Sequence, residues 1–406
     1  MTIRDLFDEH ITADNEGRSI KQSSRIIKYL SKSDSAVTLS GLANHLKLSV
    51  PTVTKLMNEL KKRELIVKEG KKETENGRKP VVYTLRKDKF FAVGVEILLK
   101  RVHVEIFNID LKSEYLQTDR TFILEDNREC CNKVVDFINN TIELSGISRD
   151  YIIGVGVGLT GRVNSHLGRS YNYFSFNDPP VAEYLSSQLD LPVFIDNDTR
   201  VTGLAEQVAG KLKNINNTLI VNISRGIGMS IMANKRFITG SSGFAGEFGH
   251  MQFRCNDGRL CICGKKGCLE TEVSGRALEA DLVEAVAKGE LSVKFDNTNI
   301  QNVRYDDIIE AANNGDQLST SLLQAQGEKL GIALGNIINL LNPEVIVISG
   351  KYARVGGFFR DSIQYGLHKT ALKDPLANCQ LSSSEIAAKS GAIGAAAQVY
   401  KRYELI

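Results

Sequence analysis

Four residues of metal-ligating types lie close together in the sequence. His250 is followed by Cys261, Cys263 and Cys268, and glycines between the cysteines permit tight turns. One imidazole and three thiolates satisfy the tetrahedral coordination of Zn²⁺ and leave no open position for catalysis. The spacing therefore predicts a structural zinc site. The alternatives are reduced thiols without a metal, or Cys255 as a competing ligand.

Acidic and amide side chains form a second candidate group, suited to binding a sugar. Glu247 and Glu270 flank the cysteines, and Asn197 and Asp198 follow a predicted strand at 193–195, where a helix begins. Open α/β sheets bind their ligands at such strand ends. Carboxylates and amides that accept and donate in pairs suit sugar hydroxyls. Any one of these residues alone is more often a helix cap or a surface acid.

The composition places these groups in a large globular chain. It has 406 residues, of which 42% are hydrophobic and 24% are charged. That indicates two or three domains and excludes a largely disordered or collagen-like chain. Seven cysteines are too few for a disulfide-stapled fold, and no apolar run approaches the ~20 residues that span a bilayer. The first ten residues contain acids and no apolar segment, so we expect a cytoplasmic protein without membrane insertion.

Charge is distributed unevenly along the chain. Residues 1–90 contain 19 Lys and Arg against 12 Asp and Glu, a net charge of +7, whereas the remainder contains 32 against 36, or −4. A basic segment on a mildly acidic body indicates nucleic-acid contact at one end. The alternative is a solvated charged surface.

The basic segment has the pattern of a helix-turn-helix. After a predicted helix at 19–31, apolar residues at helical spacing predict a second helix at 39–46. A short turn then leads to a third helix at 50–60, which Ser49 can cap and in whose first turn Pro51 fits. Such a helix enters the major groove with its N-terminal residues at the base edges.

Two strand-like stretches follow, at 65–69 and 81–85, with a basic loop between them. This is typical of a winged helix-turn-helix domain, whose loop reaches phosphates or a minor groove. We expect a flexible arm at 1–16 and the winged domain at 17–86. The alternative is a winged domain that contacts only proteins. The predicted partner is operator DNA, contacted by Ser49, Thr52, Thr54, Lys55, Arg78 and Lys79.

From Phe90 onward, buried strand patterns alternate with helical ones, which predicts an α/β fold. Taken together, the residues resemble the ROK family of repressors, open reading frames and sugar kinases, over nearly the whole chain. The resemblance implies that residues 90–406 form a two-lobed, actin-like ATPase (ribonuclease-H-like) sugar-kinase fold, with a zinc loop at about 247–270. The N-terminal winged helix is what the family's xylose and N-acetylglucosamine repressors add.

The resemblance also implies the roles of individual residues. The zinc ligands would be His250, Cys261, Cys263 and Cys268, with His250 also facing the sugar through its other ring nitrogen. Gly161 matches the glycine of the family's Pro-Gly sugar loop, although the proline is Thr160 here. The implied sugar-binding residues are Gly161, Asn197, Asp198, Glu247, His250 and Glu270.

The nucleotide motifs of the family kinases are altered. Asp198 matches the catalytic base, but the first phosphate motif, Asp-x-Gly-Gly-Thr, reads Glu96-Ile97-Leu98-Leu99-Lys100 here. Two leucines would block the close approach of a phosphate to the backbone. The second motif, typically Gly-Thr-Gly-x-Gly, reads Ser224-Arg225-Gly226-Ile227-Gly228, and the adenosine-side Gly-Gly reads Gly350-Lys351. We therefore expect that the protein is not an enzyme and that Asp198 is a vestigial base.

Lys100 and Arg225 stand at phosphate-loop positions where the family kinases have threonine. Two cations there would suit an anionic ligand, so we hypothesise that they contact the phosphate of a phosphorylated sugar. The alternative is that both side chains point to solvent or form internal ion pairs.

The sequence therefore predicts a sugar-responsive, DNA-binding transcriptional regulator that represses carbohydrate-utilisation genes. Its effector would be a sugar or sugar phosphate, and a homodimer or homotetramer would bind a palindromic operator. The enzyme alternative is an active ATP-dependent ROK sugar kinase that carries a DNA-binding domain, which ATP turnover on a sugar would reveal. A third possibility is control by a partner protein, such as a component of sugar transport.

Overall fold

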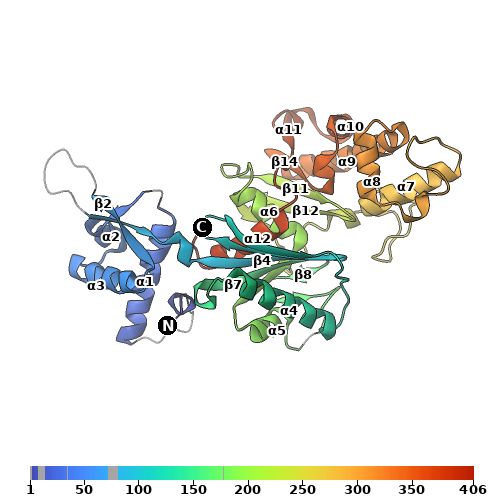
Figure 1. The fold of residues 1–406 in the computed structure, drawn as a ribbon. Helices are drawn as coiled ribbons and strands as arrows, with labels where there is room; N and C mark the ends of the chain where they lie inside the picture. The colour runs from blue at the N-terminus through green and yellow to red at the C-terminus, as the bar shows by residue number, and fades with distance from the viewer. Residues whose placement is uncertain (1, 8–13, 34, 72–80, 177) are drawn as a thin grey trace. The chain divides into compact units, whose positions relative to one another are not determined.

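The computed structural model describes residues 2–7, 14–33, 35–71, 81–176 and 178–406 (Figure 1). The chain forms two compact units. The first unit comprises residues 1–201 and 392–406, and the second comprises residues 202–391. The N-terminal helices belong to the first unit, and the chain returns to that unit at its C-terminus.

The N-terminal part of the first unit has the order of a winged helix-turn-helix domain. Ser49 and Thr38 cap the two helices of the motif through backbone N–H groups of Thr52 and Gly41. The turn between them contains Lys47 with a positive φ of 54°. The three wing strands pair in the order β1-β3-β2. The elements are α1 (Asn15–Ser31), β1 (Val37–Thr38), α2 (Leu39–Leu46), α3 (Val50–Lys62), β2 (Ile66–Lys71) and β3 (Val81–Leu85).

The flexible arm expected over residues 1–16 is wrong for residues 3–7, which are packed. Ile3, Leu6 and Phe7 are buried, on and beside the short 3-10 helix η1 (Arg4–Leu6). The Ile3 N–H donates to the Asp150 carbonyl at 3.2 Å, and the Phe7 ring lies 5.1 Å from that of Tyr403. Apolar residues at i, i+3 and i+4 make one face of a helical turn, which explains why so short a segment can be buried.

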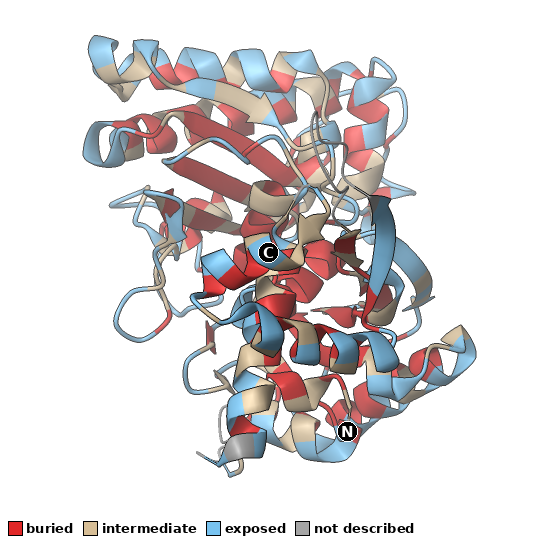
Figure 2. Cartoon of the chain, turned by 90° about the vertical axis from the view of Figure 1, so that its left-hand side faces the viewer, coloured by how far each residue is buried: buried red, intermediate tan, exposed pale blue. Residues whose placement is uncertain are grey.

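Five strands form the central sheet of the first unit: β4 (Phe91–Leu98), β5 (Arg101–Asn108), β6 (Ser113–Asp119), β7 (Ile152–Leu159) and β10 (Val193–Asn197). Their order is β10-β7-β4-β5-β6, with β4, β5 and β6 antiparallel and with β7 and β10 parallel to β4. The central strands are buried (Figure 2). The helices α4 (Arg128–Ser145) and α5 (Val181–Leu189) pack against this sheet.

Helix α12 (Ser390–Arg402) lies unusually close to β4 and β7. A Cβ atom at Gly94 would lie 2.1 Å from the carbonyl oxygen of Ala392, and one at Gly156 would lie 1.8 Å from that of Ala395. Only glycine on the strands permits this approach, and the small side chains of α12 leave room for it. The close contact ties the C-terminal helix to the strands that lead to the candidate site.

The second unit repeats the same sheet plan: β11 (Thr218–Ile223), β12 (Ile227–Ala233), β13 (Arg236–Phe237), β14 (Val345–Gly350) and β15 (Gln380–Ser383). The order is β13-β12-β11-β14-β15, again an antiparallel meander joined by two parallel strands. Each half therefore opens with a β-hairpin, as two actin-like lobes require. Helix α6 (Asp198–Val208) begins in the first unit and ends in the second.

Helices enclose the core of the second unit. Two of them, α9 (Gln317–Leu341) and α10 (Gly357–Thr370), approach each other closely, since a Cβ at Gly331 would lie 2.1 Å from the Ile363 carbonyl oxygen. No helix within the described ranges is long and apolar enough to cross a bilayer. The helices are α7 (Gly275–Ala287), α8 (Tyr305–Asn313), α9 (Gln317–Leu341), α10 (Gly357–Thr370) and α11 (Lys373–Ala377). The short elements are η2 (Lys87–Lys89), η3 (Arg149–Tyr151), β8 (Val163–Asn164), β9 (Arg169–Ser170), η4 (Phe248–His250), η5 (Leu269–Thr271), η6 (Ile300–Asn302) and η7 (Lys351–Arg354).

Candidate functional site

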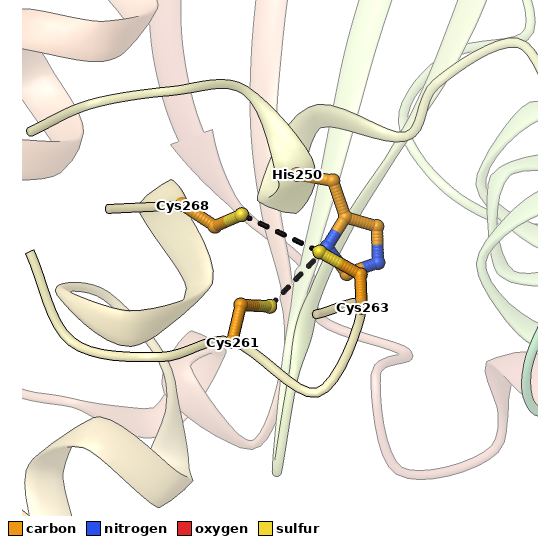
Figure 3. A group of neighbouring side chains, drawn as sticks. All are labelled: His250, Cys261, Cys263 and Cys268. Carbon is orange, nitrogen blue, oxygen red and sulfur yellow. Dashed lines mark hydrogen bonds between the residues drawn. The ribbon is translucent and has the colours of Figure 1, made fainter. Parts of the chain in front are cut away.

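The four predicted metal ligands converge in the second unit (Figure 3). The ligand atoms of His250, Cys261, Cys263 and Cys268 all lie within 4.8 Å of one another. The Sγ atoms of Cys263 and Cys268 are 3.6 Å apart, and Cys261 Sγ lies 3.6 Å from His250 Nδ1. Ligands about 2.0–2.3 Å from a tetrahedral zinc ion are separated by about 3.5–3.8 Å. The donor set and its spacing therefore fit a metal ion.

Backbone hydrogen bonds shape the Cys/His loop, which we define as residues 247–270. The Cys261 N–H donates to the Lys265 carbonyl at 2.8 Å and closes a turn in which Gly264 has a φ of +86°. At Gly267, which has a φ of +76°, a Cβ would lie 1.9 Å from the Arg254 carbonyl oxygen. The glycines that the sequence places between the cysteines are thus required by the geometry.

Two of the three thiols in this group, those of Cys261 and Cys268, have a pKa above the ordinary value, whereas the pKa of Cys263 is lowered by hydrogen bonds from Lys265 and the neighbouring thiols. Burial, together with the neighbouring thiols Cys263 and Cys261, raises the pKa of Cys268 to about 12. A cation bound to the sulfur favours the thiolate and offsets this cost. The exposed Cys255 lies outside the group of close donors within the described residues, so the geometry favours His250 and the three other cysteines over this alternative.

Two carboxylates lie beside the metal-ligand group. His250 turns Nδ1 toward Cys261, while its Nε2 lies 3.7 Å from Glu247 Oε2. The side chain of Glu270 accepts the Ile227 N–H at 3.3 Å. A Cβ at residue 226 would lie 2.6 Å from that carboxylate, so Gly226 makes room for Glu270. The structure thus gathers Glu247, His250 and Glu270 in the second unit.

The remaining predicted sugar ligands lie in the first unit. Asn197 ends β10 and donates through Nδ2 to the Gly161 carbonyl at 2.7 Å, while its Oδ1 accepts the Thr199 N–H at 3.0 Å. Asp198 begins α6, and its Oδ1 also accepts the Thr199 N–H, at 2.7 Å. Gly161, Asn197 and Asp198 therefore form one hydrogen-bonded group at the carboxyl ends of β7 and β10.

The environment of Asp198 makes it a weaker acid than usual. Burial raises the pKa of its carboxyl to about 6, against hydrogen bonds from Thr199 and from the Thr160 hydroxyl, which lower the pKa. The negative charge of Glu96 adds to the increase. The sequence marked Thr160 only as a departure from Pro-Gly, and the structure gives its hydroxyl a partner.

The first phosphate motif is a tight hairpin turn whose groups already have partners. Glu96 forms an ion pair with Arg101 across the β4–β5 hairpin. Leu99 packs against the apolar core of the first unit, and its carbonyl accepts the Leu124 N–H at 3.0 Å. Lys100 is exposed in the turn. Leu99 therefore places an apolar side chain at a motif position where the family kinases have glycine.

The second phosphate motif, in the second unit, is also engaged internally. The Ser224 carbonyl accepts the Gly275 N–H at 2.8 Å, and the Arg225 carbonyl accepts the Arg276 N–H at 3.1 Å. The Arg225 guanidinium lies 3.8 Å from Glu279 and is half-exposed. This contact corresponds to the internal ion pair that was the alternative for Arg225. The phosphate contacts of Lys100 and Arg225 stay a prediction.

The predicted DNA face of α3 combines exposed and internally bonded groups. Ser49 Oγ lies 2.7 Å from Thr52 Oγ1, and Thr54 Oγ1 donates to the Val50 carbonyl at 2.8 Å. The Lys55 side chain is exposed. A shallow pocket of about 640 Å³ is lined by Val50, Pro51, Thr54, Lys55, Asn58, Glu59 and Lys62. The predicted wing contacts, Arg78 and Lys79, lie outside the described residues.

The sequence analysis missed Arg200, a residue that supports this site. Its guanidinium is buried at 6% exposure, beside Asp196 in the turn that carries Asn197 and Asp198. Opposite charges four residues apart, one near the end of β10 and one in the first turn of α6, could have indicated the ion pair. The contact of Arg200 with the Val163 carbonyl, at 2.7 Å, had no local signal.

These features define the class of protein to which the chain belongs. It combines an N-terminal helix-turn-helix domain with a two-lobed, actin-like fold that carries the Cys/His loop. The model of the ROK family matches residues 94–402. The chain belongs to the ROK family, and the predicted fold class and resemblance are confirmed.

Curated relatives match most of the chain in sequence. It is 25% identical over 354 residues to the xylose repressor of Caldicellulosiruptor bescii, covering 87% of this chain and 88% of that protein. It is 28% identical over 362 residues to the DNA-binding transcriptional dual regulator NagC of Escherichia coli K12, covering 88% and 87%.

Solved structures show the same fold. A ROK family transcriptional regulator, a homolog of the E. coli MLC protein, superposes with a TM-score of 0.79 at 23% identity and covers 95% of this chain and 97% of its own. A ROK glucokinase from Streptomyces griseus superposes with a TM-score of 0.66 at 21% identity, covering 77% and 99%.

Proposed function

We propose that this protein is a sugar-responsive, DNA-binding transcriptional repressor of carbohydrate-utilisation genes. The observation that carries the proposal is the joining of a capped helix-turn-helix to a ROK domain whose first phosphate motif is a leucine-containing hairpin turn. The names of the xylose repressor and of NagC support it, since both relatives span the DNA-binding and ROK parts together.

The effector is a sugar, and each unit carries groups that can recognise its hydroxyls. In the first unit these are Asn197, Asp198 and the backbone of Gly161; Asn197 donates to the Gly161 carbonyl, and Asn197 and Asp198 both accept the Thr199 N–H. In the second unit they are Glu247, His250 and Glu270. Carboxylates accept from sugar hydroxyls, while amide N–H groups donate to them, so the two sets read both hydrogen-bonding directions.

Zinc is the metal that suits the Cys/His loop, because three thiolates and one imidazole are its preferred structural ligands. When bound, the ion would cross-link the loop and fix the orientation of the His250 ring. His250 would bind through Nδ1, which faces Cys261, and its Nε2 would stay directed toward Glu247. The metal therefore has a structural role, and four ligands leave no position for substrate.

Phosphoryl transfer from ATP is not part of the proposed function. It needs backbone N–H groups that cradle phosphates, and a base that is ionised at the working pH. The first phosphate turn presents Leu99 and an occupied carbonyl instead. Asp198 retains the position of a base but serves as an acceptor for a sugar hydroxyl.

Repression requires that sugar binding change operator affinity. We propose a homodimer or homotetramer that presents paired recognition helices to a palindromic operator. Thr52 and Lys55 of α3 would reach bases and phosphates, as would Arg78 and Lys79 of the wing. If the sugar is an inducer, linkage requires that sugar and DNA oppose each other by the same factor.

The test has two stages. The purified protein is screened by thermal shift against glucose, xylose, N-acetylglucosamine and the 6-phosphates of glucose and N-acetylglucosamine, without ATP. A ligand at ~100 times its dissociation constant should add about 2.7 kcal/mol to the free energy of unfolding. Genomic fragments that the protein selects are then titrated with the hit, and we expect release of the DNA.

Two controls separate the proposal from its rivals. Lys55→Glu should abolish selection of DNA fragments but leave the thermal shift unchanged, because it reverses a charge on α3 far in sequence from the sugar ligands. ADP formation that depends on the sugar would contradict the proposal and establish the kinase. Release of DNA by cell extract, with no response to any sugar, would instead indicate a partner protein.

A further inference from the structure

The 160–163 loop and the 196–200 segment are joined by hydrogen bonds at successive positions. Asn197 Nδ2 donates to the Gly161 carbonyl at 2.7 Å, and Arg200 Nη2 donates to the Val163 carbonyl, also at 2.7 Å. The loop and the segment are far apart in sequence and follow β7 and β10, which are adjacent parallel strands. Two carbonyls of the loop are therefore fixed by two residues that flank Asp198.

Arg200 is the buried element of this arrangement. Its Nε and Nη2 atoms lie 2.6 Å and 2.5 Å from Asp196 Oδ1, which also accepts the Asn197 N–H at 2.7 Å. Burying a charged pair costs desolvation free energy that Coulomb attraction often does not recover. A plain apolar contact would hold β8 at least as well. The ion pair therefore needs a reason beyond stability.

We infer that Arg200 is a positioning residue that holds Asn197 and the Gly161 loop in the geometry for binding a sugar before any ligand arrives. The inference rests on the proposed function, because it assigns the sugar to these residues. The planar guanidinium can bond Asp196 and the Val163 carbonyl at once, which sets the spacing between the turn and the loop. The ligand class is a polyhydroxylated sugar, whose hydroxyls meet an ordered loop.

Preorganisation has a measurable consequence. A mobile loop would have to become ordered when the sugar binds, and this ordering would lower the affinity. A loop that is already fixed avoids that cost. This supplies a way for the protein to bind sugar without a nucleotide. The N–H groups of Thr160 and Arg162 donate to the Ile97 carbonyl and to Asn172 Oδ1. Because the two carbonyl contacts keep the loop in place, exchange of these amide hydrogens should be slow in the free protein and nearly unchanged by sugar.

The experiment removes the buried pair as a pair. Arg200→Met alone would leave the mostly buried Asp196 carboxylate without its cation, so Asp196→Asn and Arg200→Met are combined. Glu129→Gln with Lys133→Met is the matched control, because it removes an exposed i,i+4 ion pair from α4 in the same unit. Arg200→Lys keeps the charge but loses the planar fork, and should give partial recovery.

Two measurements are made on the full-length proteins. Hydrogen exchange of residues 160–163 is followed in the absence and presence of xylose or N-acetylglucosamine. Affinity for each sugar is measured by calorimetry without ATP. We expect the double variant to exchange faster in the free state, to regain protection with sugar, and to bind about tenfold or more weakly. The control pair should match the wild type in both measurements.

The outcomes are distinct. The inference would be overturned if the double variant had the same exchange rates and sugar affinity as the wild type. It would also be overturned if the loop of the wild-type protein became strongly protected only after sugar is added. Faster exchange in the free variant would still support the positioning role if neither sugar binds the wild type. In that case the assignment of these sugars fails, and the proposed function fails with it at this site.

Discussion

The two sets of candidate sugar ligands are held in place by different means. In the first unit, the chain's own polar groups fix Gly161, Asn197 and Asp198 through hydrogen bonds and the buried Arg200. In the second unit, His250 lies in a group of three thiols, and burial raises the pKa of one of them, Cys268, to about 12. The first arrangement is held by hydrogen bonds and an ion pair of the folded chain, whereas the proposed zinc ion would complete the second.

The electrostatics of buried carboxylates show the same contrast. Asp198 is partly buried, and desolvation together with the nearby acid Glu96 raises its pKa to about 6. Beside the Cys/His loop, burial raises the pKa of Glu272, but ion pairs with Lys329 and Arg254 outweigh burial and hold the pKa below its ordinary value. The Asp198 carboxyl therefore changes its charge near pH 6, whereas Glu272 stays ionised near neutral pH and stabilises the fold through its ion pairs.

Loss of the metal should have the largest effect, and the effect should be confined to the Cys/His loop of the second unit. Cys268→Ser removes a buried ligand, so we expect the protein to lose its zinc and about 4 kcal/mol or more of unfolding free energy. Metal analysis and thermal unfolding measure both quantities. Cys255→Ser, at an exposed cysteine outside the group, should change neither.

Hydrogen exchange can show where that loss falls. We expect it to accelerate over residues 247–270 in Cys268→Ser, and to stay as in the wild type over residues 160–163 and 196–200. Acceleration in both regions would show that the first arrangement depends on the metal as well. Wild-type protein that contains no zinc would contradict the assignment of the metal.

The Glu272 ion pairs should have the next largest effect. Its carboxylate is 2.7 Å from Lys329 Nζ and 3.2 Å from Arg254 Nε, and the residue is buried. Glu272→Gln leaves both cations without their partner, so we expect about 2 kcal/mol of destabilisation at pH 7. Chemical denaturation measures this, with the exposed Glu284→Gln as the matched control.

The sign of the pH dependence follows from the lowered pKa of Glu272. A carboxyl with a lowered pKa stabilises the folded state above its unfolded value, which is 4.5, and loses that contribution as the pH falls through the folded value. The difference between the wild type and Glu272→Gln should therefore shrink below about pH 4.5. A difference that is constant with pH would show that packing, and not charge, is lost.

Asp198 predicts a smaller effect, on sugar binding and at higher pH. Its pKa of about 6 means that the carboxyl is half ionised near pH 6 and almost fully ionised only above about pH 7. Because the ionised form accepts more strongly from sugar hydroxyls, affinity should fall as the pH decreases through 6, to about a tenth at pH 5. Calorimetry from pH 5 to 8 measures this, and Asp198→Asn should bind weakly with no such dependence. Affinity that rises toward pH 5 would contradict the role of Asp198 as an acceptor.

These differences explain what the sequence could predict. The metal ligands and their glycines lie within one short stretch, so spacing alone indicated the group that the structure brings together. The winged domain was predictable because caps and strand patterns are local. The buried face of Ile3, Leu6 and Phe7 was not, because its partners lie at Asp150 and Tyr403, far along the chain.

The residues that hold Gly161, Asn197 and Asp198 in place were also not predictable from the sequence, for the same reason. Arg200 and Val163 are 37 residues apart, and only the parallel pairing of β7 with β10 brings them together. Likewise, Glu272 and Lys329 are 57 residues apart. Local patterns therefore identified the residues that could bind ligands, whereas the residues that hold them required the fold.

The smallest predicted effect concerns Arg225, which belongs to neither arrangement. Its guanidinium is half-exposed and only 3.8 Å from Glu279, so a phosphate would have to compete with a weak ion pair. If the effector is phosphorylated, Arg225→Ala should weaken binding of the 6-phosphate about fivefold and leave the unphosphorylated sugar unchanged. Lys100→Ala should act in the same direction, and Arg236→Ala, at an exposed arginine of β13, should not. Equal affinities for the sugar and its 6-phosphate, unaffected by Arg225→Ala, would show that Arg225 only pairs with Glu279, and that sugar recognition depends on the two arrangements alone.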